Sequence, residues 1–108
     1  MSADDLVSLT GGRLLARSER SIRRAAVDSR LVEPGFLFVA LPGERTDGHE
    51  HIDDAIARGA AAILVTRPVP APHADVSLIR VANGLEALAA LKNQFDPTGI
   101  MNPGKLIK

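Results

Sequence analysis

Residues 28–49, DSRLVEPGFLFVALPGERTDGH, place hydrogen-bonding side chains on both sides of one apolar run, Phe36 to Leu41. Asp-Ser-Arg precedes the run and Pro-Gly-Glu-Arg-Thr follows it. Small hydroxyls and backbone N–H groups at a strand end approach phosphate closely, and Gly43 carries no Cβ to hold a ligand away. Arg45 can add a charge-assisted hydrogen bond. The two segments, called the cradle loops here, therefore bracket one rigid strand with groups that suit an anion.

Each of these side chains also has a plainer interpretation. Asp28 and Arg30 are favoured to close a turn or to pair with each other, and Glu44 and Arg45 equally suit solvated loop charges. Pro34-Gly35 predicts a type II turn without chemistry. Local sequence alone leaves the role of Ser29 open.

The segment DGHEH raises the question of a metal site. His49 and His51 lie close in sequence to Asp47, Asp53 and Asp54. A spacing of two residues suits one face of a strand, but this segment leads into a helix, where such positions diverge. We therefore expect no metal here, and His49 is expected to order the turn.

Residues Gly99 to Lys105 satisfy the phosphate-loop pattern G-x-x-x-x-G-K. Leu106 stands where that motif needs Ser or Thr for Mg²⁺, and Pro103 removes one of the N–H groups that would cradle a phosphate. The three residues that follow Lys105 are too few for the helix that completes such a site. A phosphate loop is not expected.

The composition is that of one ordinary globular domain. The 108 residues are 45% apolar and 24% charged, with 13 basic and 13 acidic side chains and no cysteine. No net charge recruits nucleic acid or a membrane surface, and no apolar run approaches the roughly 18 residues that span a bilayer. The N-terminus lacks the features of a signal peptide. We expect a cytoplasmic protein without nucleic-acid or membrane partners.

The elements that must position the cradle loops follow an α/β pattern. The uninterrupted apolar run FLFVAL predicts a strand buried on both faces, and hence helices on both sides of a mixed sheet in a single three-layer domain. Ser2 and Gly11-Gly12 predict the ends of a first helix, and Asn83 the start of a last one with Leu85, Leu88, Ala89 and Phe95 along one side. Between them, strands are expected within 13–17, 21–29, 36–41, 61–66 and 76–81, and a further helix within 51–60.

The stretch AVDSRLVEPGFLFVALPGERTDGHEHIDDAIARGAAAILVTRP, with LTGGRLL before it and VANGLEALAAL after it, resembles the N-terminal domain of the Mur ligases of the MurF and MurE type. These enzymes are ATP-dependent amide ligases of peptidoglycan synthesis, and the resemblance is closer to MurF, the UDP-N-acetylmuramoyl-tripeptide–D-alanyl-D-alanine ligase. It implies the fold of that domain over residues 1–91.

The resemblance also implies a substrate and its binding residues. In that family the domain holds the UDP end of UDP-MurNAc-peptide. The implied UDP-binding residues are Val27, Ser29, Gly43, Glu44, Arg45 and Thr46, with Asp28, Arg30 and His49 in possible support. We accordingly expect Ser29 and Thr46 to lie on the same side of the molecule.

Residues 92–108, KNQFDPTGIMNPGKLIK, depart from that pattern. They resemble the C-terminal end of FAD-linked oxidases of the glycolate oxidase and D-lactate dehydrogenase type. Nothing else resembles the flavin-binding body of those enzymes, so no flavin is expected. The segment is interpreted as a foreign tail that completes the last helix, with a strand from Ile100 or Leu106 placed at a sheet edge.

The resemblance assigns ATP and Mg²⁺ to ligase domains that this sequence does not contain. The chain is therefore expected to bind a nucleotide sugar without cofactors of its own and without catalysing ligation alone. The alternative is a folded chimeric scaffold that retains no ligand. A flavin-related fragment, which rests on the tail alone, is the weakest interpretation.

Overall fold

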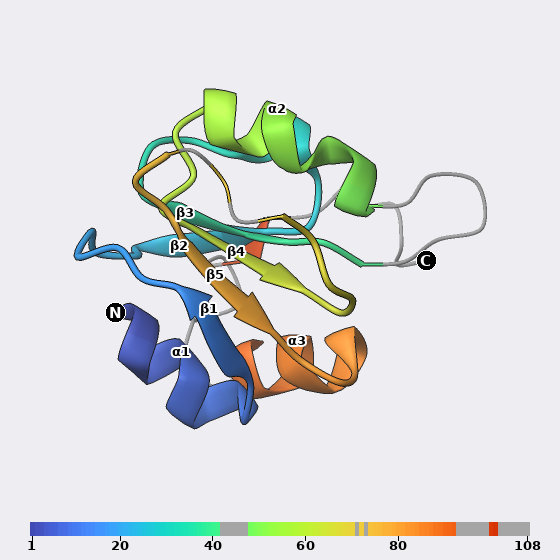
Figure 1. The fold of residues 1–108 in the computed structure, drawn as a ribbon. Helices are drawn as coiled ribbons and strands as arrows, with labels where there is room; N and C mark the ends of the chain where they lie inside the picture. The colour runs from blue at the N-terminus through green and yellow to red at the C-terminus, as the bar shows by residue number, and fades with distance from the viewer. Residues whose placement is uncertain (42–47, 71, 73, 93–99, 102–108) are drawn as a thin grey trace.

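The computed structural model describes residues 1–41, 48–70, 72, 74–92 and 100–101. A six-stranded mixed sheet forms its middle layer (Figure 1). The strands are β1 (Arg13–Ala16), β2 (Arg24–Ala26), β3 (Phe36–Val39), β4 (Ala62–Val65), β5 (Ser77–Arg80) and β6 (Ile100–Met101). They lie in the order β1-β5-β4-β3-β2-β6, and β1 alone is antiparallel to its neighbour.

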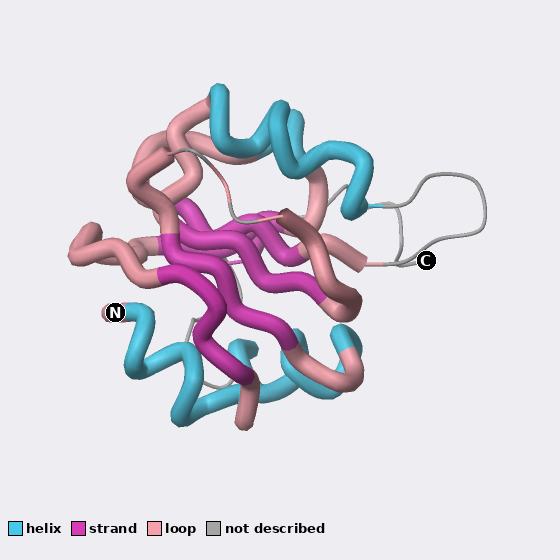
Figure 2. The backbone as a smooth tube through the Cα atoms, in the orientation of Figure 1, coloured by secondary structure: helices cyan, strands magenta, loops and turns pink. Residues whose placement is uncertain are grey.

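Helices cover both faces of this sheet, as expected for a three-layer domain. Figure 2 shows α1 (Ala3–Thr10) and α3 (Gly84–Lys92) on one face and α2 (Ile52–Ala57) on the other. Two short 3₁₀ helices, η1 (Ser29–Leu31) and η2 (Gly48–His51), follow β2 and precede α2. No helix in the described part of the chain is both long and apolar enough to cross a membrane.

The central strands are buried on both faces because neither carries a polar residue. Every residue of β3 and β4 is buried, and successive side chains point to opposite faces. Leu37, Val39 and Leu64 join the core cluster that also contains residues of α1 and α3, whereas Phe36, Phe38 and Ile63 join the cluster that contains Ala55 of α2. The strand expected from FLFVAL is thus confirmed.

The ends of α1 confirm their expected signals. The Ser2 hydroxyl accepts a hydrogen bond from the Asp5 amide, and the Asp5 carboxylate accepts one from the Ser2 amide. Each side chain satisfies an N–H group that has no partner within the helix. Gly11 ends the helix with a left-handed φ of 70°, a conformation that glycine adopts without strain.

The expected apolar side of α3 was wrong for Leu85 and Ala89, but Leu88 is partly buried and packs against the core as expected. Leu85 is 69% exposed and Ala89 is also exposed, whereas the helix buries Gly84, Ala87 and Leu91. Gly84 lies so close to the sheet that an added Cβ would come within 2.7 Å of Leu41 Cδ2. This approach turns the small residues inward. Asn83 caps the helix as expected: its side-chain oxygen accepts hydrogen bonds from the amides of Leu85 and Glu86. Phe95 lies outside the described residues.

The two ends of the sheet are held differently. At the end where β4 and β5 begin, the Arg20 guanidinium donates to the carbonyl oxygens of Gly59, Ala60 and Asp75, at 2.9, 3.2 and 3.0 Å. At the β2 edge, β6 pairs parallel with β2, which confirms the expected edge strand at Ile100. The assignment of 92–108 as a separate tail stays a prediction.

Candidate functional site

Four parallel strands, β2 to β5, bring their carboxyl ends to one edge of the sheet (Figure 1). The residues that follow them are Val27, Ala40, Thr66 and Val81. In open α/β sheets ligands bind in the crevice outside these strand ends. Most of the described residues expected in the cradle loops lie at this edge, so we treat it as the candidate site.

The turn after β2 is built around Asp28. Its carboxylate caps η1 by accepting the Arg30 amide at 2.9 Å, and it also accepts Arg30 Nε at 3.0 Å. The hydrogen bonds from the Arg30 side chain are the main cause that lowers the pKa of Asp28. The expectation that Asp28 and Arg30 close a turn and pair with each other is confirmed. Val27, immediately before them, is half-buried and packs on the core.

Ser29 is buried, with 5% of its surface exposed. A hydrogen bond from its hydroxyl is the main influence that lowers the pKa of Asp54 on α2. Asp54 also accepts Arg58 Nε at 3.1 Å, and Arg58 Nη1 donates to the Arg30 carbonyl at 3.4 Å. The turn is therefore fastened to α2 as well as to itself.

The chain that follows β3 returns to the same edge. The Gly48 amide donates to the Leu41 carbonyl at 2.8 Å, so the segment between them has its two ends joined. Gly43, Glu44, Arg45 and Thr46 belong to that segment and lie outside the described residues.

His49 connects this return to the next strand. It is largely buried, and its Nε2 accepts the Thr66 amide at 3.1 Å and lies 3.4 Å from Thr66 Oγ1. The prediction that His49 orders its turn is confirmed by this bond to the end of β4.

His51 of η2 influences two carboxylates near this edge. Its charge contributes to lowering the pKa of Asp28 in the turn after β2, behind the larger effect of Arg30. It also contributes to lowering the pKa of Asp54, behind Ser29 and Arg58. Both η1 and η2 contact α2, so this helix links the 28–31 turn to the segment that follows β3.

Two hollows flank this edge. One, of about 380 Å³, is lined by Leu41, Thr66, Ala82, Asn83, Gly84 and Leu85. Because Asn83 already accepts the first amides of α3, this hollow offers an apolar and amide surface rather than a phosphate site.

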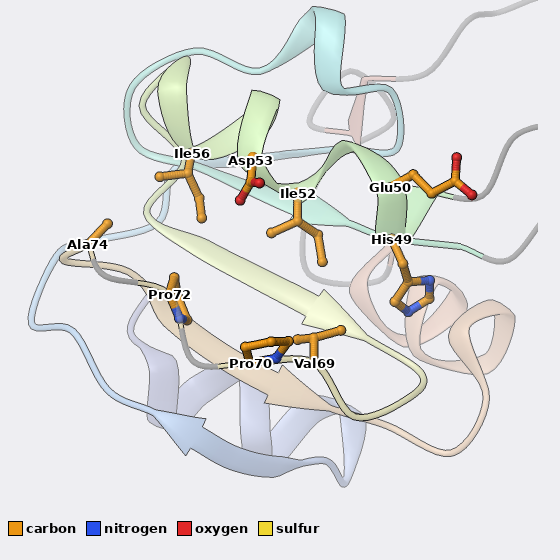
Figure 3. Close-up of a pocket in the computed structure, with 9 residues that line it drawn as sticks. All are labelled: His49, Glu50, Ile52, Asp53, Ile56, Val69, Pro70, Pro72 and Ala74. Carbon is orange, nitrogen blue, oxygen red and sulfur yellow. The ribbon is translucent and has the colours of Figure 1, made fainter.

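The second hollow, of about 520 Å³, lies between α2 and the proline-rich loop after β4 (Figure 3). Ile52 and Ile56 of α2 point toward Val69 and Pro70, whereas the Glu50 carboxylate points away from them. The surface is mainly apolar. Among the described residues, no three His, Cys, Asp or Glu side chains come close enough to hold a metal ion.

A family model described as "Mur ligase family, catalytic domain" matches residues 21–96. The chain belongs to the Mur ligase family. It is 39% identical over 94 residues to the UDP-N-acetylmuramoyl-L-alanyl-D-glutamate–2,6-diaminopimelate ligase of Pseudomonas putida, covering 83% of this chain and 19% of that protein. It is 44% identical over 72 residues to the UDP-N-acetylmuramoyl-tripeptide–D-alanyl-D-alanine ligase of Mycobacterium tuberculosis strain H37Rv, covering 67% of this chain and 14% of that protein.

The crystal structure of MurF from Acinetobacter baumannii shares this Mur ligase fold. It superposes with a TM-score of 0.71 at 33% sequence identity, over 83% of this chain and 20% of the MurF chain. MurF from Thermotoga maritima, solved with ADP, gives 0.56 at 35% identity over 68% of this chain and 17% of its own. The expected N-terminal-domain fold of the MurF and MurE type is confirmed. The chain spans about a fifth or less of the length of these relatives.

Sequence reasoning missed three residues that build this edge: Asp54, Arg58 and Thr66. Asp54 and Arg58 have the i,i+4 spacing of a helix ion pair. That spacing predicts their contact with each other but not their contact with the 28–31 turn. Thr66 directly follows a buried strand. Like Ser29, it is a small hydroxyl residue near a strand end and could have been singled out for that reason.

Proposed function

We propose that this Mur ligase domain binds the UDP moiety of a UDP-MurNAc-peptide. The observation that carries the proposal is that two segments reach the carboxyl edge, where η1 of the 28–31 turn and η2 both contact α2. The relatives named above are ligases whose names begin with UDP-N-acetylmuramoyl. A ligand held by both segments would lie across the ends of β2 and β3.

The charges at this edge suggest which residues contact the diphosphate. The Arg30 guanidinium is held by Asp28 and that of Arg58 by Asp54, so each of these two positive charges already has a partner. We assign the diphosphate to Arg45, with Gly43, Glu44 and Thr46 of the same loop, as the resemblance implies. These four loop residues, together with Val27 and Ser29, form the proposed UDP-binding site.

Ser29 has a narrower role in this proposal than a phosphate contact. Hydrogen bonding to Ser29 lowers the pKa of Asp54, and the Ser29 oxygen can also accept a hydrogen bond from a ligand. An acceptor suits the N3–H group of uracil better than a phosphate oxygen. Val27 and the main chain of the turn would lie against the base.

We further propose that the domain binds without catalysing ligation by itself. The one sequence resembling a phosphate loop, Gly99 to Lys105, continues with Leu106 and so lacks the hydroxyl that holds Mg²⁺. ATP and Mg²⁺ are accordingly assigned to other parts of a Mur ligase. A cytoplasmic location fits a substrate of this kind.

The test is an amide NMR titration of the ¹⁵N-labelled chain with UDP and with UDP-MurNAc-tripeptide. Saturable shifts at 27–30 and 48–51 are expected, and Ser29→Ala should weaken them. Ser8→Ala, a change at an exposed residue of α1, is the matched control and should bind like the parent chain. An absence of shifts at roughly 5 mM ligand, an affinity weaker than about −3 kcal/mol, would favour the scaffold without a ligand.

A further inference from the structure

The ion pair between Asp54 of α2 and Arg58, the residue that caps the C-terminal end of α2, reaches the 28–31 turn at two successive residues. Hydrogen bonding to the Ser29 side chain is the largest influence that lowers the pKa of Asp54, and η1, which begins at Ser29, contacts α2. Arg58 donates Nε to Asp54 at 3.1 Å and Nη1 to the Arg30 carbonyl at 3.4 Å. A side-chain acceptor and a side-chain donor of one helix thus hold a hydroxyl and a carbonyl of one turn.

We propose that Asp54 and Arg58 are positioning residues that fix the 28–31 turn in the shape that binds a uridine diphosphate. The inference rests on the proposed function for its ligand. Neither residue need touch that ligand. They act through Ser29 and Arg30, as supporting residues do when they hold a binding loop on a rigid element.

The exposure of the pair shows why its effect is local. The two side chains are 43% and 42% exposed, and an isolated ion pair of this kind contributes little to stability because solvent screens it. Ser29, by contrast, is buried. Loss of the pair should therefore loosen the turn more than it destabilises the fold.

Asp53 provides a matched control. It precedes Asp54 on the same helix and carries the same charge, but it lines the hollow opposite the proline-rich loop (Figure 3). Asp54→Asn is expected to weaken UDP binding about three- to tenfold, the range for one or two lost hydrogen bonds. Asp53→Asn should leave the affinity unchanged, as measured by the same NMR titration.

A charge swap separates positioning from helix stability. In Asp54→Arg/Arg58→Asp the helix keeps an i,i+4 pair, but a donor now faces the Ser29 hydroxyl and an acceptor faces the Arg30 carbonyl. Positioning predicts that binding stays weak in this variant. Recovery of the parent affinity would overturn the proposal, because the pair would then act only through the helix.

Hydrogen exchange without ligand tests the turn itself. The amides of Leu31 and Val32 donate to the carbonyls of Asp28 and Ser29 and should exchange faster in Asp54→Asn than in Asp53→Asn or the parent chain. Equal exchange in all three would overturn the proposal. Faster exchange in a chain that does not bind UDP would instead reject the proposed ligand and leave the anchoring of the turn established.

Discussion

Gly48→Ala is expected to damage the candidate site by forcing the chain that leaves β3 to move. An added Cβ would lie 2.7 Å from the Leu41 amide nitrogen, 3.0 Å from Ala40 Cα and 3.1 Å from the Leu41 carbonyl oxygen. Ordinary contacts begin at 3.4 Å, so the main chain must move apart by about 0.7 Å. All three atoms belong to the backbone of the chain leaving β3, which cannot rotate away as a side chain can.

The expected cost follows from two contributions. Relieving the overlap costs about 1–3 kcal/mol, the range for overpacking a filled site. The displacement also weakens the 2.8 Å bond from the Gly48 amide to the Leu41 carbonyl, which contributes about 1 kcal/mol. The free energy of unfolding should therefore fall by about 2–4 kcal/mol. Because this bond joins the two ends of the 42–47 segment, UDP affinity should fall as well.

Urea unfolding followed by far-UV circular dichroism measures the first effect, and the NMR titration measures the second. Gly11→Ala is the control: its φ of 70° strains an alanine, but no atom lies within 4 Å of the new Cβ. Backbone strain alone costs about 1 kcal/mol. If Gly48→Ala destabilises the chain less than Gly11→Ala, the argument from close approach is refuted.

Two further predictions concern buried and charged hydrogen bonds. Ser77→Ala should lower the free energy of unfolding by about 1–3 kcal/mol, as measured by urea titration. The buried Ser77 hydroxyl accepts a hydrogen bond from the Ser18 amide at 2.8 Å, and its loss leaves that amide unpaired. Ser21→Ala, at an exposed residue, is the control and should change the free energy of unfolding by less than about 0.5 kcal/mol. Arg30 lowers the pKa of Asp28 in the folded chain, so this carboxylate contributes stability above its unfolded pKa, and the contribution is lost as pH falls below about 4. Asp28→Asn should flatten that part of the stability–pH curve, and an unchanged slope would contradict the assignment.

The sequence predicts elements well where their cause is local. FLFVAL needs no distant information to be recognised as a strand buried on both faces, and Ser2 and Asn83 mark helix starts through bonds that span only two or three residues. The paired turn of Asp28 and Arg30 was predictable for the same reason.

The sequence predicts less where the cause is distant. The buried side of α3 depends on Gly84 meeting Leu41, 43 positions earlier, and a helical pattern read alone favours the larger Leu85 instead. The link from His49 to Thr66 likewise joins residues 17 apart. Such contacts exist only once the strands are in register, so they emerge from the assembled sheet.

The contacts of Arg20 give the two ends of the sheet different responses to acid. The end where β4 and β5 begin is held by the Arg20 guanidinium, which donates to three backbone carbonyl groups, and no carboxylate takes part in these bonds. The opposite end depends on the carboxylates of Asp28 and Asp54. On acidification the hydrogen bonds at the carboxyl ends of the strands should therefore weaken first while those of Arg20 persist, so a pH titration would separate loosening of the 28–31 turn from loss of the fold.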